Sequence, residues 1–351
     1  MIVDWGLARQ IAGFAAGSDP TPALGVDLQA LADAAEGQVA GYTGLALSGA
    51  CPPAEALDRR AWAEVNLATL ADFLDPVGER LGGRMEGAGP LAGALRAAAG
   101  ATLAAEAGLV VGYMSQKVLG QFELSLMQPE SAPRLLFVTP NLDRTLRQHG
   151  ELDRESFIGW VVLHEMTHVL QFGGVPWLRG HMSALLQEYL RSVEVRIERG
   201  QAGGLPSMPD PARIIESFRE GGLVALVQTR EQRSIMGRMQ ATMAVIEGYS
   251  EHVMDAVGEQ VLPHYAGLRE AMDRRRRSRS TPERILMKLL GMDMKMRQYE
   301  DGKRFCDAVA DRHGLERLNR VWAEPGCMPA LSELSEPDTW AARVAPQAVP
   351  A

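Results

Sequence analysis

The stretch VVLHEMTHVLQFGG, residues 161–174, places two histidines and a glutamate inside an apolar run. On an α-helix, residues four apart lie on the same face, so His164 and His168 can direct their rings at one point, with Glu165 beside it. Imidazole is a good zinc ligand, and a glutamate at this position can act as the general base that deprotonates a zinc-bound water. The spacing therefore predicts a zinc site with His164 and His168 as ligands and Glu165 as the catalytic base.

The alternative interpretation is a pair of core histidines with ordinary hydrogen bonds. In a chain of 351 residues with 7 histidines, the five-residue pattern arises by chance in about one sequence in a hundred. The flanking sequence favours the metal, because Asp153 or Ser156 can cap a helix that Gly173 and Gly174 end. The pattern thus stands on the kind of helix that the chemistry requires.

A catalytic zinc site uses three protein ligands and leaves the fourth position for water. The metzincin pattern does not supply the third ligand, because Gln171 and Gly174 stand where its glycine and last histidine would be. The later stretch MAVIEGYSEHVMDAV offers Glu247, Glu251 and Asp255 at successive helical turns. Three like charges on one stripe repel and need a cation beside them, which a zinc ion with its two histidines would supply.

We favour Glu247 as the third ligand, because Glu-Gly-Tyr-Ser resembles the Glu-Gly-Phe-Ala type of stretch in gluzincin aminopeptidases, whose glutamate binds zinc. Glu251, one turn later, would then accept a hydrogen bond from a ligand histidine. The rival assignment makes Glu251 the ligand and gives Asp255 the supporting role. Four further side chains are candidates for contacts with the substrate or the developing oxyanion, although packing is the simpler role for each: Tyr249, His252, His181 and Tyr299.

The composition bounds the class of partner. Lys and Arg total 36 against 44 Asp and Glu, and the net charge of −8 argues against a general binder of nucleic acid or anionic membranes. The basic run Arg274–Ser280 is more simply a solvated loop than a phosphate site. We therefore expect a peptide or a small amide as substrate, and no nucleic-acid or membrane partner. The oligomeric state is not encoded in any pattern that we recognise.

The cysteines and the N-terminus indicate a cytoplasmic protein. Cys51, Cys306 and Cys327 are odd in number and far apart, which predicts neither a disulfide framework nor a zinc ribbon. The N-terminal stretch carries Asp4 and Arg9 within its apolar part and lacks a basic start, which disfavours a signal peptide.

The elements that must hold the site are mostly helices. Periodic segments rich in Ala and Gly near residues 27–40, 54–82 and 90–125 predict an N-terminal helical bundle. The apolar stretch from Leu91 within it fits a tightly packed soluble helix better than a membrane span. The clearest strand is Leu135–Val138, whose partner the sequence does not identify.

After the HEMTH helix we expect a second long helix from about Met182 to Arg199 and further helices from Ala212 to about Val261. The fold class is therefore mainly α, an α-rich α+β fold with a small β element. We divide the chain into a helical N-terminal region at 1–130, a catalytic region at 131–340 and a flexible tail at 341–351, all in one compact unit.

Several segments together resemble a zincin-like metallopeptidase family of actinobacterial and chloroflexi-type bacteria. These segments are HEMTHVLQF followed by VPWL, then IEGYSEHVMD, DRRAWAEVN, VLGQFEL, MRQYEDGKRF and NRVWAEP. Members of that family are labelled as hydrolases or as proteins associated with biosynthesis of the deazaflavin coenzyme. The resemblance covers nearly the whole chain and implies a mostly helical zincin-like fold. It also implies roles for His164, Glu165, His168 and Glu247, but it brings no substrate.

These observations predict a zinc hydrolase that cleaves an amide or peptide bond with a zinc-activated water. The alternative is a helical binding or scaffold protein whose zinc site is structural or degenerate, because an unrestrained protease would be hazardous in the cytoplasm. An open fourth position on the metal favours the enzyme, and a closed one favours the structural role.

Overall fold

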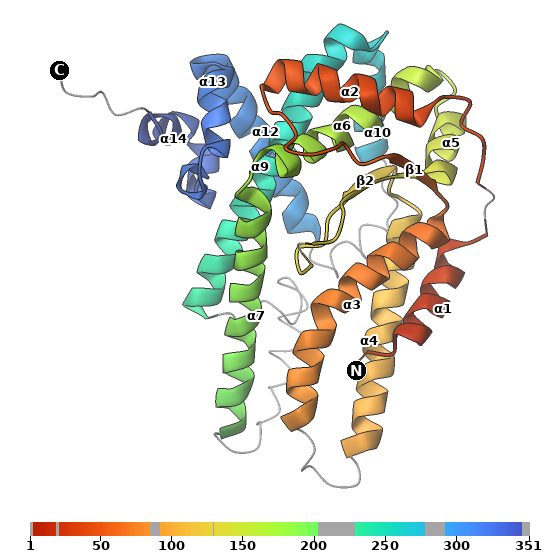
Figure 1. Ribbon diagram of the computed structural model, residues 1–351, viewed down its shortest axis with the longest axis vertical. Coiled ribbons are helices and arrows are strands. Elements are labelled where there is room, and N and C mark those ends of the chain that lie inside the picture. Colours follow the sequence, from red (N-terminus) through yellow and green to blue (C-terminus); the bar gives the residue numbers. More distant parts are fainter. Residues whose placement is uncertain are drawn as a thin grey trace, which may run out of the picture. The chain divides into compact units, whose positions relative to one another are not determined.

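The computed structural model describes residues 3–18, 21–84, 92–128, 130–202, 229–277 and 292–345. It is mainly helical with a small three-stranded sheet, which confirms the predicted fold class (Figure 1). Contacts between Cα atoms divide the chain into two units, which we describe separately. The first unit is Met1–Gly37 with Gly49–Val169, and the second is Gln38–Ser48 with Leu170–Ala351. The boundary predicted at residue 130 stays a prediction.

Three helices of the first unit pack together, α1 (Trp5–Ala16), α3 (Arg59–Arg84) and α4 (Ala92–Ser115) (Figure 1). The side chain of Asp4 caps α1 by accepting a hydrogen bond of 3.0 Å from the Leu7 amide. Glycines let α4 approach α1 closely, since a Cβ atom at Gly108 would lie 2.6 Å from the Ala8 carbonyl oxygen. The predicted N-terminal bundle is therefore present over these segments.

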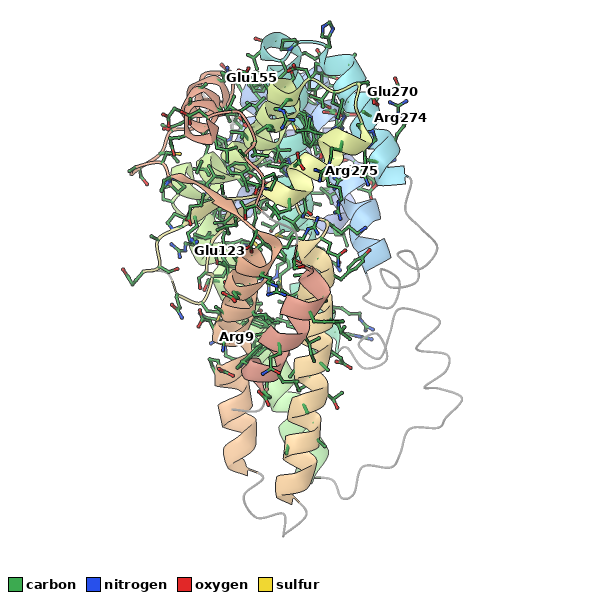
Figure 2. The ribbon with its side chains drawn as sticks, turned by 90° about the vertical axis from the view of Figure 1, so that its right-hand side faces the viewer. Arg9, Glu123, Glu155, Glu270, Arg274 and Arg275 are labelled. Atoms are coloured by element: carbon green, nitrogen blue, oxygen red, sulfur yellow. The ribbon has the colours of Figure 1, made fainter. Side chains whose placement is uncertain are left out.

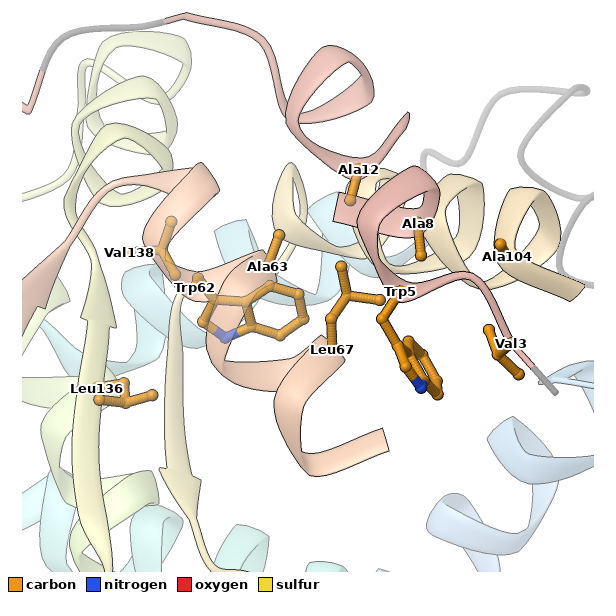
Figure 3. Packing of buried hydrophobic residues seen from close by; sticks show 10 residues of the cluster. All are labelled: Val3, Trp5, Ala8, Ala12, Trp62, Ala63, Leu67, Ala104, Leu136 and Val138. Carbon is orange, nitrogen blue, oxygen red and sulfur yellow. The ribbon is translucent and has the colours of Figure 1, made fainter. Parts of the chain in front are cut away.

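The core of the first unit forms between these helices and the sheet. Figure 3 shows Trp62 and Leu67 of α3 facing residues of α1, and the Trp5 indole donates a 2.9 Å hydrogen bond to Asp75. Burial of such large apolar side chains is the main stabilising contribution to folding. The cluster consists of Val3, Trp5, Ala8, Ala12, Trp62, Ala63, Leu67, Ala104, Leu136 and Val138.

Helix α4 carries the apolar stretch noted in the sequence. Residues Ala97–Ser115 are long and apolar enough to cross a membrane, which is weak evidence because core helices pass the same test. Its glycine face packs on α1, but only 22% of that window is buried. The helix is thus tightly packed on one face rather than all round.

The sheet has the order β1-β3-β2, formed by β1 (Ala54–Leu57), β2 (Gly120–Glu123) and β3 (Arg134–Val138). Strand β3 lies in the centre, parallel to β1 and antiparallel to β2, and Leu135–Val138 is fully buried. The predicted strand is confirmed and its two partners are identified. The helical prediction was wrong for both partners: Ala-Glu-Ala-Leu has a helical propensity, but pairing with a buried strand overrides it.

Asn141 joins the end of α4 to the helix that follows β3, α5 (Thr139–Gln148). Its side-chain amide donates to the carbonyl oxygens of Ser115 and Val118, at 2.8 and 2.6 Å. Its oxygen accepts a 2.8 Å hydrogen bond from Arg59. Because Asn141 and Arg59 are buried, this polar bridge fixes where the chain leaves α4 and enters β2.

The predicted HEMTH helix is present as α6 (Arg154–Gly174). Asp153 is its cap and accepts a 2.8 Å hydrogen bond from the Ser156 amide, so Ser156 itself lies within the helix. The terminal glycines do not adopt the left-handed conformation. They are required by a close approach instead, since a Cβ atom at Gly173 would lie 2.6 Å from Leu47 and one at Gly174 would lie 2.8 Å from the Ala46 oxygen. The next helix, α7 (Leu178–Ala202), begins four residues earlier than predicted.

The second unit is built around α9 (Arg230–Val261) and α12 (Met292–His313). A capping box of Thr229 and Gln232 starts α9, whereas the predicted helical residues 212–228 lie outside the described residues. Two glycines bring these helices into backbone contact: a Cβ atom at Gly248 or Gly302 would lie within 3.0 Å of backbone atoms of the other helix. No side chain fits between α9 and α12 at this crossing.

Helix α10 (Tyr265–Arg277) carries most of the basic run that we expected to be a loop. Figure 2 shows Glu270, Arg274 and Arg275 along it, of which Glu270 and Arg274 are exposed. Basic residues in the last turn of a helix interact favourably with its dipole. The loop prediction was therefore wrong for the arginines up to Arg277, and residues 278–280 lie outside the described residues.

Two further segments complete the second unit. The end of α2 (Leu28–Thr43) belongs to it, and the Thr43 carbonyl accepts a 2.8 Å hydrogen bond from Asn319. In α14 (Pro337–Arg343), the fully buried Trp340 donates to the Cys327 carbonyl at 2.8 Å. Ala341 and Val344 of the predicted tail are buried, and its residues 346–351 lie outside the described residues. The short helices between α12 and α14 are α13 (Leu315–Leu318), η2 (Asn319–Trp322), η3 (Pro325–Cys327) and η4 (Leu331–Ser335).

Candidate metal centre

The two histidines of α6 point their Nε2 atoms at each other. These atoms lie 3.3 Å apart, and the rings meet edge to face with centroids 4.8 Å apart. His168 is buried and His164 is half-buried, while Val162, Leu163, Met166 and Val169 are buried around them. The apolar flanks thus hold the helix in the core and leave the two imidazoles on one face, as the i, i+4 spacing predicts.

This separation fits a shared metal ion. Two nitrogen ligands at about 2.05 Å from a tetrahedral zinc lie about 3.3–3.4 Å apart. A direct hydrogen bond between two Nε2 atoms needs one ring to carry its proton there, whereas a metal accepts both lone pairs at once. The donor set and its geometry therefore suit zinc.

Glu165 lies against strand β2 of the first unit. Its Oε2 accepts a 2.8 Å hydrogen bond from the Phe122 amide, and the side chain is buried with 7% exposure. Gly120 faces the same side chain, because a Cβ atom there would lie 2.8 Å from Cγ of Glu165. The sequence did not reveal this contact, although the glycine in VLGQFEL was the available signal.

The predicted acid stripe is present on α9, where Glu247, Glu251 and Asp255 are half-buried in an otherwise buried stretch. Basic side chains that we had not considered supply much of the expected positive charge. Arg269 donates to Glu251 at 2.7 Å, and Lys303 lies 3.0 Å from Asp255. Asp255 also accepts a hydrogen bond from the Tyr265 hydroxyl. Arg269 and Lys303 therefore compensate the negative charges of Glu251 and Asp255 in this stripe.

Gln171 ties the end of α6 to α9 next to Glu247. It is fully buried, and its side-chain amide donates a 2.9 Å hydrogen bond to the Ile246 carbonyl within the second unit. Gln171 lies three residues after His168 and seven after His164, on the same face of one continuous helix. Within the second unit, the end of this helix therefore contacts the residue before Glu247. The three predicted ligands, His164, His168 and Glu247, are of residue types that could hold a metal ion.

Tyr249 is a core residue. It is fully buried, its hydroxyl donates to Asn319 at 2.7 Å, and its ring meets Trp322 edge to face. Burial raises the pKa of Tyr249 above its ordinary value, so the phenol stays neutral. This arrangement supports the packing role rather than a substrate contact.

His252 has both ring nitrogens engaged. Nδ1 lies 2.9 Å from Asp307 and Nε2 lies 2.9 Å from the Tyr42 hydroxyl. Lys303 donates to the second oxygen of Asp307 at 2.6 Å. Burial alone would raise the pKa of Asp307, but the hydrogen bonds from His252 and Lys303 outweigh it and hold the pKa below its usual value. An oriented histidine of this kind links α2, α9 and α12 within the second unit.

The two remaining candidates carry less information. His181 stacks edge to face with Trp177 at 5.5 Å. Burial, together with the positive charge of Arg238, lowers the pKa of His181. The side chain of Tyr299 lies outside the described residues.

Comparisons with known proteins point the same way. A model of the family described as "Zincin-like metallopeptidase" matches residues 3–341. A crystal structure from Chloroflexus aurantiacus, titled as a "putative hydrolase with a novel fold", shares 28% sequence identity with a TM-score of 0.71. The alignment covers 99% of this chain and 100% of that one. No curated protein matches.

These findings support a hydrolase and imply a metal, usually zinc, for the family. They do not mention deazaflavin coenzyme biosynthesis, so that association stays a prediction. A family match over nearly the whole length settles the relationship. The chain belongs to the zincin-like metallopeptidase family.

Proposed function

We propose that the protein is a zinc-dependent hydrolase of amide or peptide bonds. The observation that carries the proposal is the 3.3 Å separation of the Nε2 atoms of His164 and His168, which suits two ligands of one tetrahedral zinc. The family match supports a metal-dependent hydrolase, and the apolar surroundings of the pair would strengthen electrostatic interactions at the site.

Glu247 is the third ligand in this proposal. Gln171 fixes α9 at Ile246, one residue before it. The rival Glu251 is bound by the Arg269 guanidinium, with side-chain exposures of only 12% and 19%. The Glu251 carboxylate already has a cation as its partner, which argues against Glu251 as the metal ligand.

Glu165 is the catalytic base. A zinc ion held by this ligand set would polarise the scissile carbonyl and make its bound water acidic. The Glu165 carboxylate would take a proton from the attacking water and later deliver it to the leaving amine. The Phe122 amide donates a hydrogen bond to one oxygen of this carboxylate.

Metal content tests the ligand set. Protein purified without chelator should contain about one zinc per chain, a stoichiometry set by a single His₂Glu site. His168→Ala and Glu247→Ala should lose it, while the matched variant Glu251→Gln, on the same helix, should retain it. Wild-type protein without zinc would refute the proposal, and full zinc in Glu247→Ala would remove Glu247 from the ligand set.

Turnover tests the chemistry. Zinc-loaded protein should be screened against peptide and small-amide libraries, with Glu165→Gln as the matched control, since it keeps the shape and loses the base. We expect hydrolysis by the wild type and its loss in the variant with zinc still bound. Zinc-loaded wild type with no turnover on either library would favour the scaffold alternative.

A further inference from the structure

Strand β2 presents one edge to the sheet and the other to Glu165. It pairs with β3 alone among the described residues, with Gln121 opposite Leu136 and Glu123 opposite Arg134. Amide groups alternate in direction along a strand. Since the Phe122 amide bonds to Glu165, it points away from β3, and the amides of Gln121 and Glu123 point toward it.

Gly120 leaves the space that the Glu165 side chain fills. A Cβ atom at this position would lie 2.8 Å from Cγ and 3.1 Å from Oε1 of Glu165, and 3.1 Å from Val161. Its φ is not in the left-handed region, so backbone conformation does not require the glycine. The close approach of α6 to the strand does.

We infer that β2 positions the catalytic base: the Phe122 amide holds Oε2 of Glu165, and Gly120 gives its methylene groups the room to reach that amide. A carboxylate held through one oxygen cannot rotate freely, so its second oxygen keeps a fixed direction. This inference rests on the proposed function. It makes Phe122 and Gly120 positioning residues that act through Glu165 by backbone alone.

Proline has no backbone N–H, and an edge strand tolerates it at a position whose N–H points away from the neighbouring strand, as at Phe122. Phe122→Pro should lower kcat ten- to a hundredfold, the range typical for loss of a supporting partner at a metal site. KM and zinc content should stay within about twofold, because the ligands and the substrate surface are untouched. The matched variant Phe122→Leu keeps the amide and should retain wild-type kcat. Equal kcat in the two variants would overturn the inference.

Gly120→Ala tests the second half of the inference. The new methyl group should displace Glu165 and lower kcat about tenfold or more. In a Glu165→Asp background the acidic side chain is one methylene shorter, so the same methyl group should change kcat by less than about twofold. Equal losses in both backgrounds would show that Gly120 does not act through Glu165.

Hydrogen exchange at single amides tests the contact without substrate or metal. In the wild type the Phe122 amide should be protected, and Glu165→Ala should remove that protection while leaving Gln121 and Glu123 protected by β3. Unchanged protection at Phe122 would overturn the inference. Loss of protection combined with an inactive zinc-loaded wild type would instead refute the proposed function and leave the contact standing.

Discussion

The glycine crossing of α9 and α12 allows a quantitative test. A Cβ atom added at Gly248 would lie closest to the carbonyl group of Gly302, and even its third neighbour, the Lys303 amide nitrogen, would be 2.5 Å away. Ordinary contact begins at 3.4 Å, so the helices must separate by at least about 0.9 Å. Gly248→Ala thus inserts a methyl group where none fits.

The cost can be compared with a matched variant on the same helix. Gly237 has nothing within 4 Å of an added Cβ, so Gly237→Ala should stabilise the helix by about 0.5–1 kcal/mol. Gly248→Ala has the same gain but an overpacking cost of about 1–3 kcal/mol. At about 2–4 °C per kcal/mol for a unit of this size, Gly237→Ala should raise Tm by about 1–4 °C. Gly248→Ala has a net loss of up to about 2.5 kcal/mol and should lower Tm by up to about 10 °C.

Calorimetry on the two variants and the wild type measures these shifts. Glu247 directly precedes Gly248, so the displaced helix should also retain zinc less well, which metal analysis after dialysis would detect. If Gly248→Ala raised Tm as much as Gly237→Ala, backbone contact between α9 and α12 would not exist and the reasoning would fail.

Two further substitutions and one labelling experiment have defined outcomes. Arg269→Met should lower the free energy of unfolding by about 2–4 kcal/mol in urea titrations, because it leaves Glu251 largely buried without its guanidinium; a loss under about 0.5 kcal/mol would contradict the ion pair. Because the pKa of Asp307 is lower in the folded protein than in the unfolded chain, ionised Asp307 stabilises the fold at pH values above the unfolded-state pKa of about 3.9. This contribution is lost as the pH falls through the folded-state pKa. Asp307→Asn should therefore destabilise at pH 7 and have little effect at pH 2, and an equal effect at both would exclude this titration. Burial, followed by the nearby Glu36, raises the pKa of Cys51 to about 11, and Cys306 is fully buried, so Ellman's reagent should label Cys51 slowly and Cys306 only after unfolding.

Local signals predicted the elements that local chemistry fixes. The start of the HEMTH helix could be predicted within a residue or so, because an aspartate cap acts within one helical turn. Its end was predicted correctly from Gly173 and Gly174, although a close approach to Ala46 and Leu47 is what requires these glycines. The pair His164 and His168 followed from helical periodicity, and their observed Nε2 separation agrees with it. The acid stripe of α9 was visible for the same reason.

Contacts between residues far apart in the chain could not be predicted from the single sequence. Strand β1 consists of good helix formers, and it is extended because it pairs with residues 81 positions later, Ala54 with Leu135. Gln171 appeared merely as the residue that breaks the metzincin pattern, yet it binds the Ile246 carbonyl. Arg269, the partner of Glu251, follows it by 18 residues and lies on the next helix, α10. Helical periodicity does not predict a contact between residues of two different helices.

The strand order β1-β3-β2 also constrains how the protein can be made. The central strand is the last of the three to be synthesised, because β1 ends at Leu57 and β2 at Glu123, while β3 extends to Val138. Until β3 leaves the ribosome, both earlier strands have unpaired edges, and the parallel pair must close a loop that already contains α3 and α4. We expect the sheet to form late and slowly, with the helical bundle assembled first. The base-positioning strand would then acquire its shape only when the nascent chain is about to deliver the histidines.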